Sequence, residues 1–342
     1  MNTTMTFGEL SRALKNGAKS AAILNENGRP TARAAGYLLE PEAIAAVDVA
    51  LELSRPLLIS GEPGVGKTEL GYAVARMLQI PDLYLHTVKS TSDAGELFYT
   101  YDALQRLRDS QLGKEGDVGD YVEFQAMGRA ILSAHQRSAI APLLRGKHVE
   151  AGNNAPAPRR SVVVIDEIDK APKDFPNDLL HEIETMSFRV KEYPGNPPPE
   201  TPSFDKIERT LRPLVVITSN EERQLPDAFL RRCVFHEIPF PDAKRLEAIV
   251  TAGLANRLQR MGVKMDGDPP KLGDGTAARL VNLMLKFRDA QPDKKPGIAE
   301  MMDAAALLVG AGASDLSVIR PAIVKLKRDG TLFQDAVRAV AS

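Results

Sequence analysis

Short apolar runs alternate with segments of helical spacing through the first two thirds of the chain. Buried strands are predicted within five runs, which are PLLIS (56–60), DLYLHTV (82–88), SVVVIDEID (161–169), LVVITSN (214–220) and VFHEI (234–238). Helices are predicted over PEAIAAVDVALELS (41–54) and GKTELGYAVARMLQ (66–79). Short apolar strands separated by helices are typical of a parallel sheet with crossover helices, so the expected fold class is α/β.

The pattern changes after Pro239 and Pro241. No strand pattern follows, and helical period is seen over 242–261, 275–290, 296–312 and 317–328. We therefore predict three parts. They are an N-terminal arm with one short helix (1–36), an α/β domain (37–240), and a small helical domain with C-terminal helices (241–342).

Two insert-like regions interrupt the α/β domain. Residues 98–160 contain helical pieces, TYDALQRLRDSQL and VEFQAMGRAILSAHQ, and end in a polar loop. Residues 188–213 carry five prolines between Pro194 and Pro202, which excludes regular structure there. The alternating FRVKE before those prolines fits one arm of a hairpin.

Composition narrows the classes of function. Among 342 residues, Lys+Arg is 44 and Asp+Glu is 45, a net charge of −1 that argues against a protein built mainly to bind nucleic acid. Cys233 is the single cysteine, so we expect a packed thiol and a reducing, cytoplasmic setting. No apolar run approaches the roughly 20 residues of a membrane helix, and the first residues do not read as a secretory signal.

The strongest motif is GEPGVGKT, which fits G-x-x-x-x-G-K-[ST] between a predicted strand and a predicted helix. Its glycines let backbone N–H groups turn toward phosphate oxygens, and the helix adds its positive N-terminal end. Lys67 is expected to reach the β- and γ-phosphates, and Thr68 to bind Mg²⁺. The predicted nucleotide-binding residues here are Gly61, Glu62, Pro63, Gly64, Val65, Gly66, Lys67, Thr68 and Glu69.

A second motif is the pair of acids that follows the run SVVVI. Asp166 at the strand end is predicted to hold Mg²⁺, and Glu167 to orient or deprotonate the attacking water. Adjacent strand residues point to opposite faces, so both roles are compatible only where the strand ends. Asp169 is expected at the surface or as a helix cap.

Two further candidates follow the last strands. Asn220 after VVITS is predicted to hydrogen-bond the γ-phosphate or the attacking water. Arg231 and Arg232 carry the planar donor fork that suits a transferring phosphoryl group, and a solvated basic pair at a helix end is the alternative. No N-K-x-D guanine signature follows the loop, which favours ATP over GTP.

These four motifs in this order resemble those of the AAA+ ATPases. The amino-acid sequence is similar to that of the MoxR-like branch in two segments, GYLLEPEAIAAVDVALELSRPLLISGEPGVGKTEL and SNEERQLPDAFLRRC. The resemblance covers roughly residues 37–310. It implies a parallel P-loop sheet followed by a helical lid, with ATP and Mg²⁺ as cofactors and a homo-oligomeric ring, usually a hexamer.

The resemblance also assigns roles to residues outside the loop. The family has L-D-R-F where this chain has L-R-R-C, so the arginine finger that serves the neighbouring subunit falls on Arg232, with Arg231 as a second candidate. A sensor-2 cation is expected at the start of a lid helix, at Lys295 or Lys294. Tyr37 and Leu38, with Leu39, stand where the family's adenine pocket begins.

Three functions are compatible with these residues. The first is an ATP-driven remodeller of an unidentified protein partner, for which a von Willebrand A domain protein is one candidate. The second is a nucleotide-gated signalling or scaffold ATPase of a bacterial multi-gene conflict or defence system. The third is a nucleic-acid motor or loader, against which the neutral charge counts.

Overall fold

The computed structural model describes residues 8–16, 23–24, 30–31, 33–149, 157–263, 271–273, 275–311 and 315–341. Contacts divide the chain into two compact units. Unit 1 comprises residues 1–31, 41–60 and 74–236, and unit 2 comprises residues 32–40, 61–73 and 237–342.

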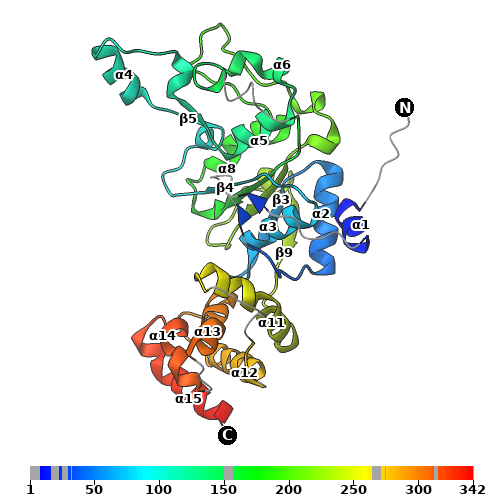
Figure 1. Ribbon diagram of the computed structural model, residues 1–342, viewed down its shortest axis with the longest axis vertical. Coiled ribbons are helices and arrows are strands. Elements are labelled where there is room, and N and C mark those ends of the chain that lie inside the picture. Colours follow the sequence, from blue (N-terminus) through cyan, green and yellow to red (C-terminus); the bar gives the residue numbers. More distant parts are fainter. Residues whose placement is uncertain are drawn as a thin grey trace. The chain divides into compact units, whose positions relative to one another are not determined.

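Unit 1 is built on a five-stranded sheet in the order β4-β7-β8-β3-β9 (Figure 1). The strands are β3 (Leu57–Ser60), β4 (Leu83–Thr87), β7 (Val162–Asp166), β8 (Leu214–Thr218) and β9 (Val234–Glu237). The pairs β4–β7, β7–β8 and β8–β3 are parallel. The predicted α/β class and parallel sheet are therefore confirmed, and the carboxyl ends of β3, β7 and β8 meet at one edge.

Burial explains why these runs form the centre of the sheet. Every residue of β3 and β8 is buried, as are the first four of β7. A strand covered on both faces must be apolar throughout, which is what its continuous run of Val, Leu and Ile provides. Besides the N-terminal arm, the insert and the end of α3, the described helices of unit 1 are α2 (Pro41–Leu53), α8 (Phe175–Asp178), α9 (Leu180–Thr185) and α10 (Asp227–Leu230).

Both helical pieces predicted in the insert of residues 98–160 begin with strand residues, Thr100 and Tyr101 in the first piece and residues 122–124 in the second. Strands β5 (Tyr99–Tyr101) and β6 (Val122–Phe124) form an antiparallel pair around α4 (Ala103–Gln111), followed by α5 (Ala126–Ala134) and α6 (Arg137–Ile140). The predicted helix over VEFQ is thus wrong for its first three residues, because Val122 and Phe124 alternate with Glu123 and bury on one face. In Figure 1, α4 lies at the far end of this insert from the sheet.

The proline-rich region after α9 contains one bridge in place of a hairpin. Arg189 and Glu200 pair in an isolated antiparallel bridge, and Phe188 and Thr201 exchange hydrogen bonds beside it. The alternation in FRVKE therefore produces a single rung, because the prolines that follow remove backbone donors.

Unit 2 contains residues 33–40, the loop after β3 and the C-terminal helices. Helix α3 (Lys67–Met77) begins in this unit and ends in unit 1. The remaining helices are α11 (Ala243–Arg260), α12 (Thr276–Asp289), α13 (Ile298–Ala311), α14 (Arg320–Ile323) and α15 (Gly330–Ala341). They bury a common apolar core that includes Phe287 and Phe333, whose rings meet edge to face at 5.6 Å.

The last predicted helix, over 317–328, is wrong in extent. A 3₁₀ turn and the four-residue α14 occupy its first part, and a second 3₁₀ turn precedes α15, which the sequence analysis missed. Pro321 fits only the first turn of a helix, so the helical segment must restart there.

Among the described residues of the N-terminal arm, α1 (Glu9–Lys15) forms the predicted short helix, and β1 (Ile23–Leu24) pairs with β2 (Pro30–Thr31). No helix within the described ranges has the length and apolar character needed to cross a bilayer.

Candidate nucleotide site

The loop between β3 and α3 has the backbone that its motif requires. Gly61, Gly64 and Gly66 have φ values of 144°, 82° and 97°, a region that residues with a Cβ rarely adopt. A Cβ at Gly61 would also lie 2.5 Å from the carbonyl oxygen of Ile238, so only glycine fits. The glycines of the motif are therefore explained by conformation and by close approach.

Lys67 begins α3 and is 7% exposed. Its Nζ donates to the carbonyl oxygens of Gly61 at 2.7 Å and of Glu62 at 3.0 Å. The ammonium group thus already lies against the loop that the motif assigns to phosphate. A buried cation beside glycine-rich backbone fits a polyanionic ligand, and Thr68 follows it in the first helical turn.

Residues 33–40 are attached to this loop by Glu69. The Glu69 carboxylate accepts from Arg33 Nε at 2.9 Å and from the Ala34 backbone N–H at 2.8 Å. Arg33 also lies over the Tyr72 ring, 3.9 Å from its centroid. Glu69, predicted only as part of the phosphate motif, therefore holds the preceding segment against α3.

Tyr37 lies on that segment, against the loop. A Cβ at Gly66 would stand 3.2 Å from Cε2 of Tyr37, so the ring and the loop are in contact. Burial, and then the charge of Glu69, raise the pKa of the Tyr37 hydroxyl well above its usual range. Leu38 contributes its carbonyl oxygen, which accepts from Arg245 at 2.7 Å. The structure thus brings Tyr37 to the loop, and its part in an adenine pocket stays a prediction.

A residue of α12 that the sequence analysis missed contacts the glycine-rich loop. Arg288, near the end of α12, donates to the Glu62 carboxylate at 2.5 Å and to the Pro296 carbonyl oxygen at 2.6 Å. Its guanidinium lies 3.5 Å from the centroid of the Phe240 ring, and its side chain is 10% exposed. Lys295, the sensor-2 candidate, is exposed, as is Lys294.

Arg288 could have been found from the helical period. It lies four residues after Met284 and follows Phe287, on the stripe of α12 that is otherwise apolar and buried. An arginine on such a stripe requires a partner, because an unpaired buried charge is costly. The turn before α13 reaches the same loop, where Ile298 N–H donates to the Gly64 carbonyl oxygen at 3.1 Å.

In unit 1, the strand ends form a second cluster of predicted residues. Thr218, the last residue of β8, donates its hydroxyl proton to Asp166 Oδ1 at 2.6 Å. The same hydroxyl accepts from the Glu167 backbone N–H at 3.0 Å. Thr218 therefore fixes the Asp166 carboxylate and the backbone of Glu167, and it was not among the predicted site residues.

Glu167 turns the chain away from β7. Its φ of 60° is left-handed, a conformation that a residue with a side chain rarely adopts. Its carboxylate accepts from Lys170 Nζ at 2.6 Å, and this hydrogen bond raises the pKa of Lys170. The turn separates the direction of Glu167 from that of Asp166, as the two predicted roles require.

The prediction for Asp169 is wrong. Asp169 is 1% exposed, and its Oδ2 accepts from the backbone N–H groups of Asn220 at 3.1 Å and Glu222 at 2.9 Å. The carboxylate thus fixes the loop that carries Asn220. Ser60, at the end of β3, donates to the Glu221 carboxylate of the same loop.

Arg231 and Arg232 follow α10 and are both exposed. Arg232 donates to the Ala228 carbonyl oxygen at 3.0 Å and to Glu184 at 3.4 Å. The next residue, Cys233, is mostly covered, and burial raises the pKa of its thiol to about 12. A neutral thiol of that kind fits the packed role predicted for it.

A parallel sheet in which β3 leads into a glycine-rich loop and a helix, with an acid at the tip of another strand of the same sheet, defines a P-loop nucleotide-binding protein. The sequence matches the AAA family, described as ATPases associated with various cellular activities, over residues 57–241. That match covers more than half of the chain, and the chain belongs to the AAA family.

Solved structures of low sequence identity are also similar. The Holliday junction branch migration motor RuvB of Thermotoga maritima is 16% identical, with 82% of this chain and 65% of that chain covered and a TM-score of 0.40. PCH-2 of C. elegans is 18% identical, with 88% of this chain and 66% of that chain covered and a TM-score of 0.36. This chain thus spans about two thirds of the length of each. No curated protein matches.

Proposed function

We propose that this protein is a Mg²⁺-dependent ATPase of the MoxR-like branch that works in the cytoplasm as a homo-oligomeric ring, a hexamer, to remodel or activate a partner protein. The observation that best supports ATP binding and hydrolysis is the glycine-rich loop, where the buried Lys67 lies against the backbone. Membership of an ATPase family supports the same reaction.

In this proposal the loop residues Gly61–Thr68 bind the phosphates of ATP, with Lys67 as the cation. Within the described ranges, no group of three or more His, Cys, Asp or Glu side chains could hold a metal ion. Mg²⁺ usually needs only one or two protein carboxylates, because waters and phosphate oxygens complete its shell. Asp166 and the Thr68 hydroxyl suit an ion of that kind.

The remaining residues act on the attacking water and the transferred group. Glu167 accepts the proton of the water or orients it, and Asn220 donates an amide hydrogen bond. Arg232, or Arg231 beside it, supplies the finger to a neighbouring subunit. Arg288 joins Lys295 as a lid candidate, supported by its contact with Glu62 of the loop.

The partner is proposed to be a protein, and a von Willebrand A domain protein is one candidate. The second function, a nucleotide-gated signalling or scaffold ATPase, is distinguished by turnover measured with and without partner. A remodeller is stimulated by its substrate, whereas a switch turns over slowly and assembles a complex in the ATP state.

Two single variants and their mixture test the proposed shared site. Lys67→Ala should lose the stabilisation that Mg-ATP gives the wild type, about 2.7 kcal/mol at a hundredfold excess over Kd, and thermal melts measure this. Arg232→Ala should keep nucleotide affinity and lose turnover, since fingers contribute about 10³–10⁵ in rate in related NTPases.

Mixing the two inactive variants should restore part of the ATPase activity, because some interfaces then combine an intact loop with an intact finger. The matched control is Arg338→Ala, an exposed arginine of α15, which should not change turnover. An unchanged ATP-induced shift in Lys67→Ala, or full turnover by a dilute monomer, would contradict the proposal.

A further inference from the structure

A small hollow lies at the amino-terminal edge of the sheet in unit 1, opposite the edge that carries Asp166. Its walls include the end of α2, the start of β8 with the residues before it, and Arg160, which lies two residues before β7. The arginines that line it are Arg55, Arg160, Arg209 and Arg212. None of them belongs to the motifs assigned to ATP.

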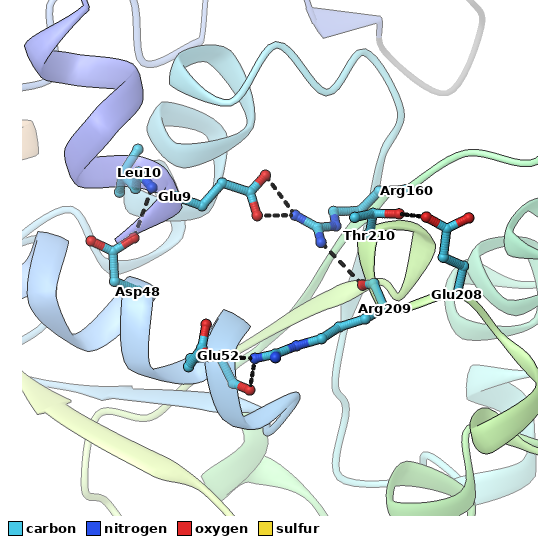
Figure 2. A network of polar contacts seen from close by, with 8 residues as sticks. All are labelled: Glu9, Leu10, Asp48, Glu52, Arg160, Glu208, Arg209 and Thr210. Carbon is cyan, nitrogen blue, oxygen red and sulfur yellow. Dashed lines mark hydrogen bonds and ion pairs between the residues drawn. The ribbon is translucent and has the colours of Figure 1, made fainter. Parts of the chain in front are cut away.

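Arg160 is the most enclosed of these cations, with a side chain 10% exposed. Its Nη1 donates to both carboxylate oxygens of Glu9, at 2.9 and 2.8 Å, and its Nη2 to the Arg209 carbonyl oxygen at 3.1 Å (Figure 2). Its Nε is buried and has no hydrogen-bond partner among the described atoms. A buried donor without an acceptor is unfavourable, so the site has capacity for one more acceptor.

The other arginines add positive charge beside it. Arg209 forms an ion pair with the Glu52 carboxylate at 3.0 Å and donates to the Glu52 carbonyl oxygen (Figure 2). Arg212 donates to the Ile207 carbonyl oxygen at 3.3 Å and to the Ser54 hydroxyl at 3.4 Å. Burial, and then the charge of Arg209, lower the pKa of Arg212, as expected where cations are crowded.

We propose that this hollow binds a small free oxyanion of the phosphate class, and that the anion competes with Glu9 for Arg160. Guanidinium groups present paired donors that match phosphate oxygens. The enclosed space in the hollow is about 10 Å³, room for roughly one water molecule. A phosphate-class anion therefore binds here only by taking the place of the Glu9 carboxylate against Arg160, and a nucleotide is too large.

Competition with Glu9 follows from the geometry of α1. The Glu9 carboxylate is about half exposed, with 47% of its side chain open to solvent, whereas its partner Arg160 is enclosed. Glu9 therefore acts as the exchangeable member of the pair. An anion that displaces it would take over both hydrogen bonds from Nη1 of Arg160.

The test uses the full chain carrying Lys67→Ala, so that the phosphate loop does not contribute. Binding of inorganic phosphate and of pyrophosphate is measured by titration calorimetry and by thermal shift at constant ionic strength. We expect saturable binding. Arg160→Gln should weaken it by about tenfold or more, the loss of a charge-assisted hydrogen bond.

Two milder variants keep the test decisive if Arg160→Gln fails to fold. Arg55→Gln changes an exposed residue of the lining and should weaken binding about two- to fivefold, whereas Glu9→Gln should tighten it by a similar factor. Arg108→Gln, an exposed residue of α4 outside the hollow, is the matched control and should change nothing.

A thermal shift that rises without saturation and is equal in all variants would overturn the proposal, because excluded salts produce that effect. Unchanged affinity in Glu9→Gln, with weakened affinity in Arg55→Gln, would overturn the competition. The proposal of a free anion would also be overturned if duplex DNA bound through these arginines and inorganic phosphate did not. The ligand would then be the phosphate backbone of a nucleic acid.

Discussion

The two edges of the sheet in unit 1 carry opposite charges. At the carboxyl ends of the strands, Asp166, Glu167 and Asp169 lie within one network held by Thr218 and backbone N–H groups. At the amino ends, arginines gather around the end of α2. Parallel strands place all like ends at one edge, so each edge collects the residues that precede or follow several strands.

The difference lies in how each charge is held. The acids of the first edge are fixed by short bonds from residues one strand away, such as the 2.6 Å contact between Thr218 and Asp166. At the other edge, Arg160 is paired with a carboxylate from α1, which is 151 residues distant along the chain. The first edge is thus built within the sheet, whereas the second depends on contacts from an N-terminal helix that lies outside the sheet.

Glu167→Gln has the largest expected effect of the variants that test whether the two edges differ in function. The amide keeps the shape of the side chain but accepts no proton, so ATP turnover should fall about 10²–10⁴-fold with nucleotide still bound. Steady-state phosphate release measures the expected loss of turnover, and a nucleotide titration measures whether affinity is retained.

Glu208→Gln is the matched control at the opposite edge, where the Glu208 carboxylate accepts from the Thr210 hydroxyl (Figure 2). It should leave turnover unchanged. Wild-type turnover in Glu167→Gln would mean that this carboxylate only pairs with Lys170. Equal losses in both variants would mean that the two edges are not functionally distinct.

The acidic edge could be predicted from sequence in large part, because its residues follow apolar runs directly. Asp166 is the last residue of β7 and Asn220 lies two residues after β8, where strand ends are visible in the pattern. The burial of Asp169 could not be predicted, since its partners, the N–H groups of Asn220 and Glu222, lie more than 50 residues away. Local sequence contains no sign of such a contact.

The arginine edge was not predicted at all, for a related reason. Arg160 follows a polar loop, and Arg209 and Arg212 lie in a proline-rich region, so all three resemble solvated charges. Only the packing of α1 and α2 shows that Arg160 is enclosed. Arg288 in unit 2 was missed as well, although its place on the apolar stripe of α12 was a usable signal.

A second variant, Asp169→Ala, tests how firmly the acidic edge is held. It would leave two backbone N–H groups without their acceptor, and hydrogen bonds to a charged group contribute about 1.5–3 kcal/mol. We expect the free energy of unfolding to fall by about that amount in urea titrations, with a loss of ATP turnover because Asn220 is displaced.

The control for that variant is Asp174→Ala. Asp174 is exposed and close in sequence, and it makes no side-chain hydrogen bond to α8, which it precedes. It should change the free energy of unfolding by less than about 0.5 kcal/mol. A change in Asp169→Ala no larger than that would show that the buried carboxylate contributes little to this edge.

The smallest expected effect concerns the attachment of α1 at the arginine edge. Asp48 of α2, 2% exposed, accepts from the Leu10 N–H at 2.7 Å (Figure 2). It also accepts from the Ser11 N–H at 3.2 Å, and so caps α1 from another helix. Asp48→Ala should cost about 0.5–2 kcal/mol, the usual range for a lost cap. Hydrogen exchange at Leu10 and Ser11 should accelerate, while exchange in β7 and β8 should not.

The same variant connects the cap to the proposed anion. If α1 detaches, Glu9 leaves Arg160, and phosphate affinity should rise as it does in Glu9→Gln. Asp93→Ala, which removes a cap from an exposed 3₁₀ turn elsewhere in unit 1, serves as the control and should alter neither exchange at α1 nor phosphate affinity. Faster exchange throughout β7 in Asp48→Ala would show that α1 supports the sheet itself, and the distinction between a self-contained edge and a detachable one would then be wrong.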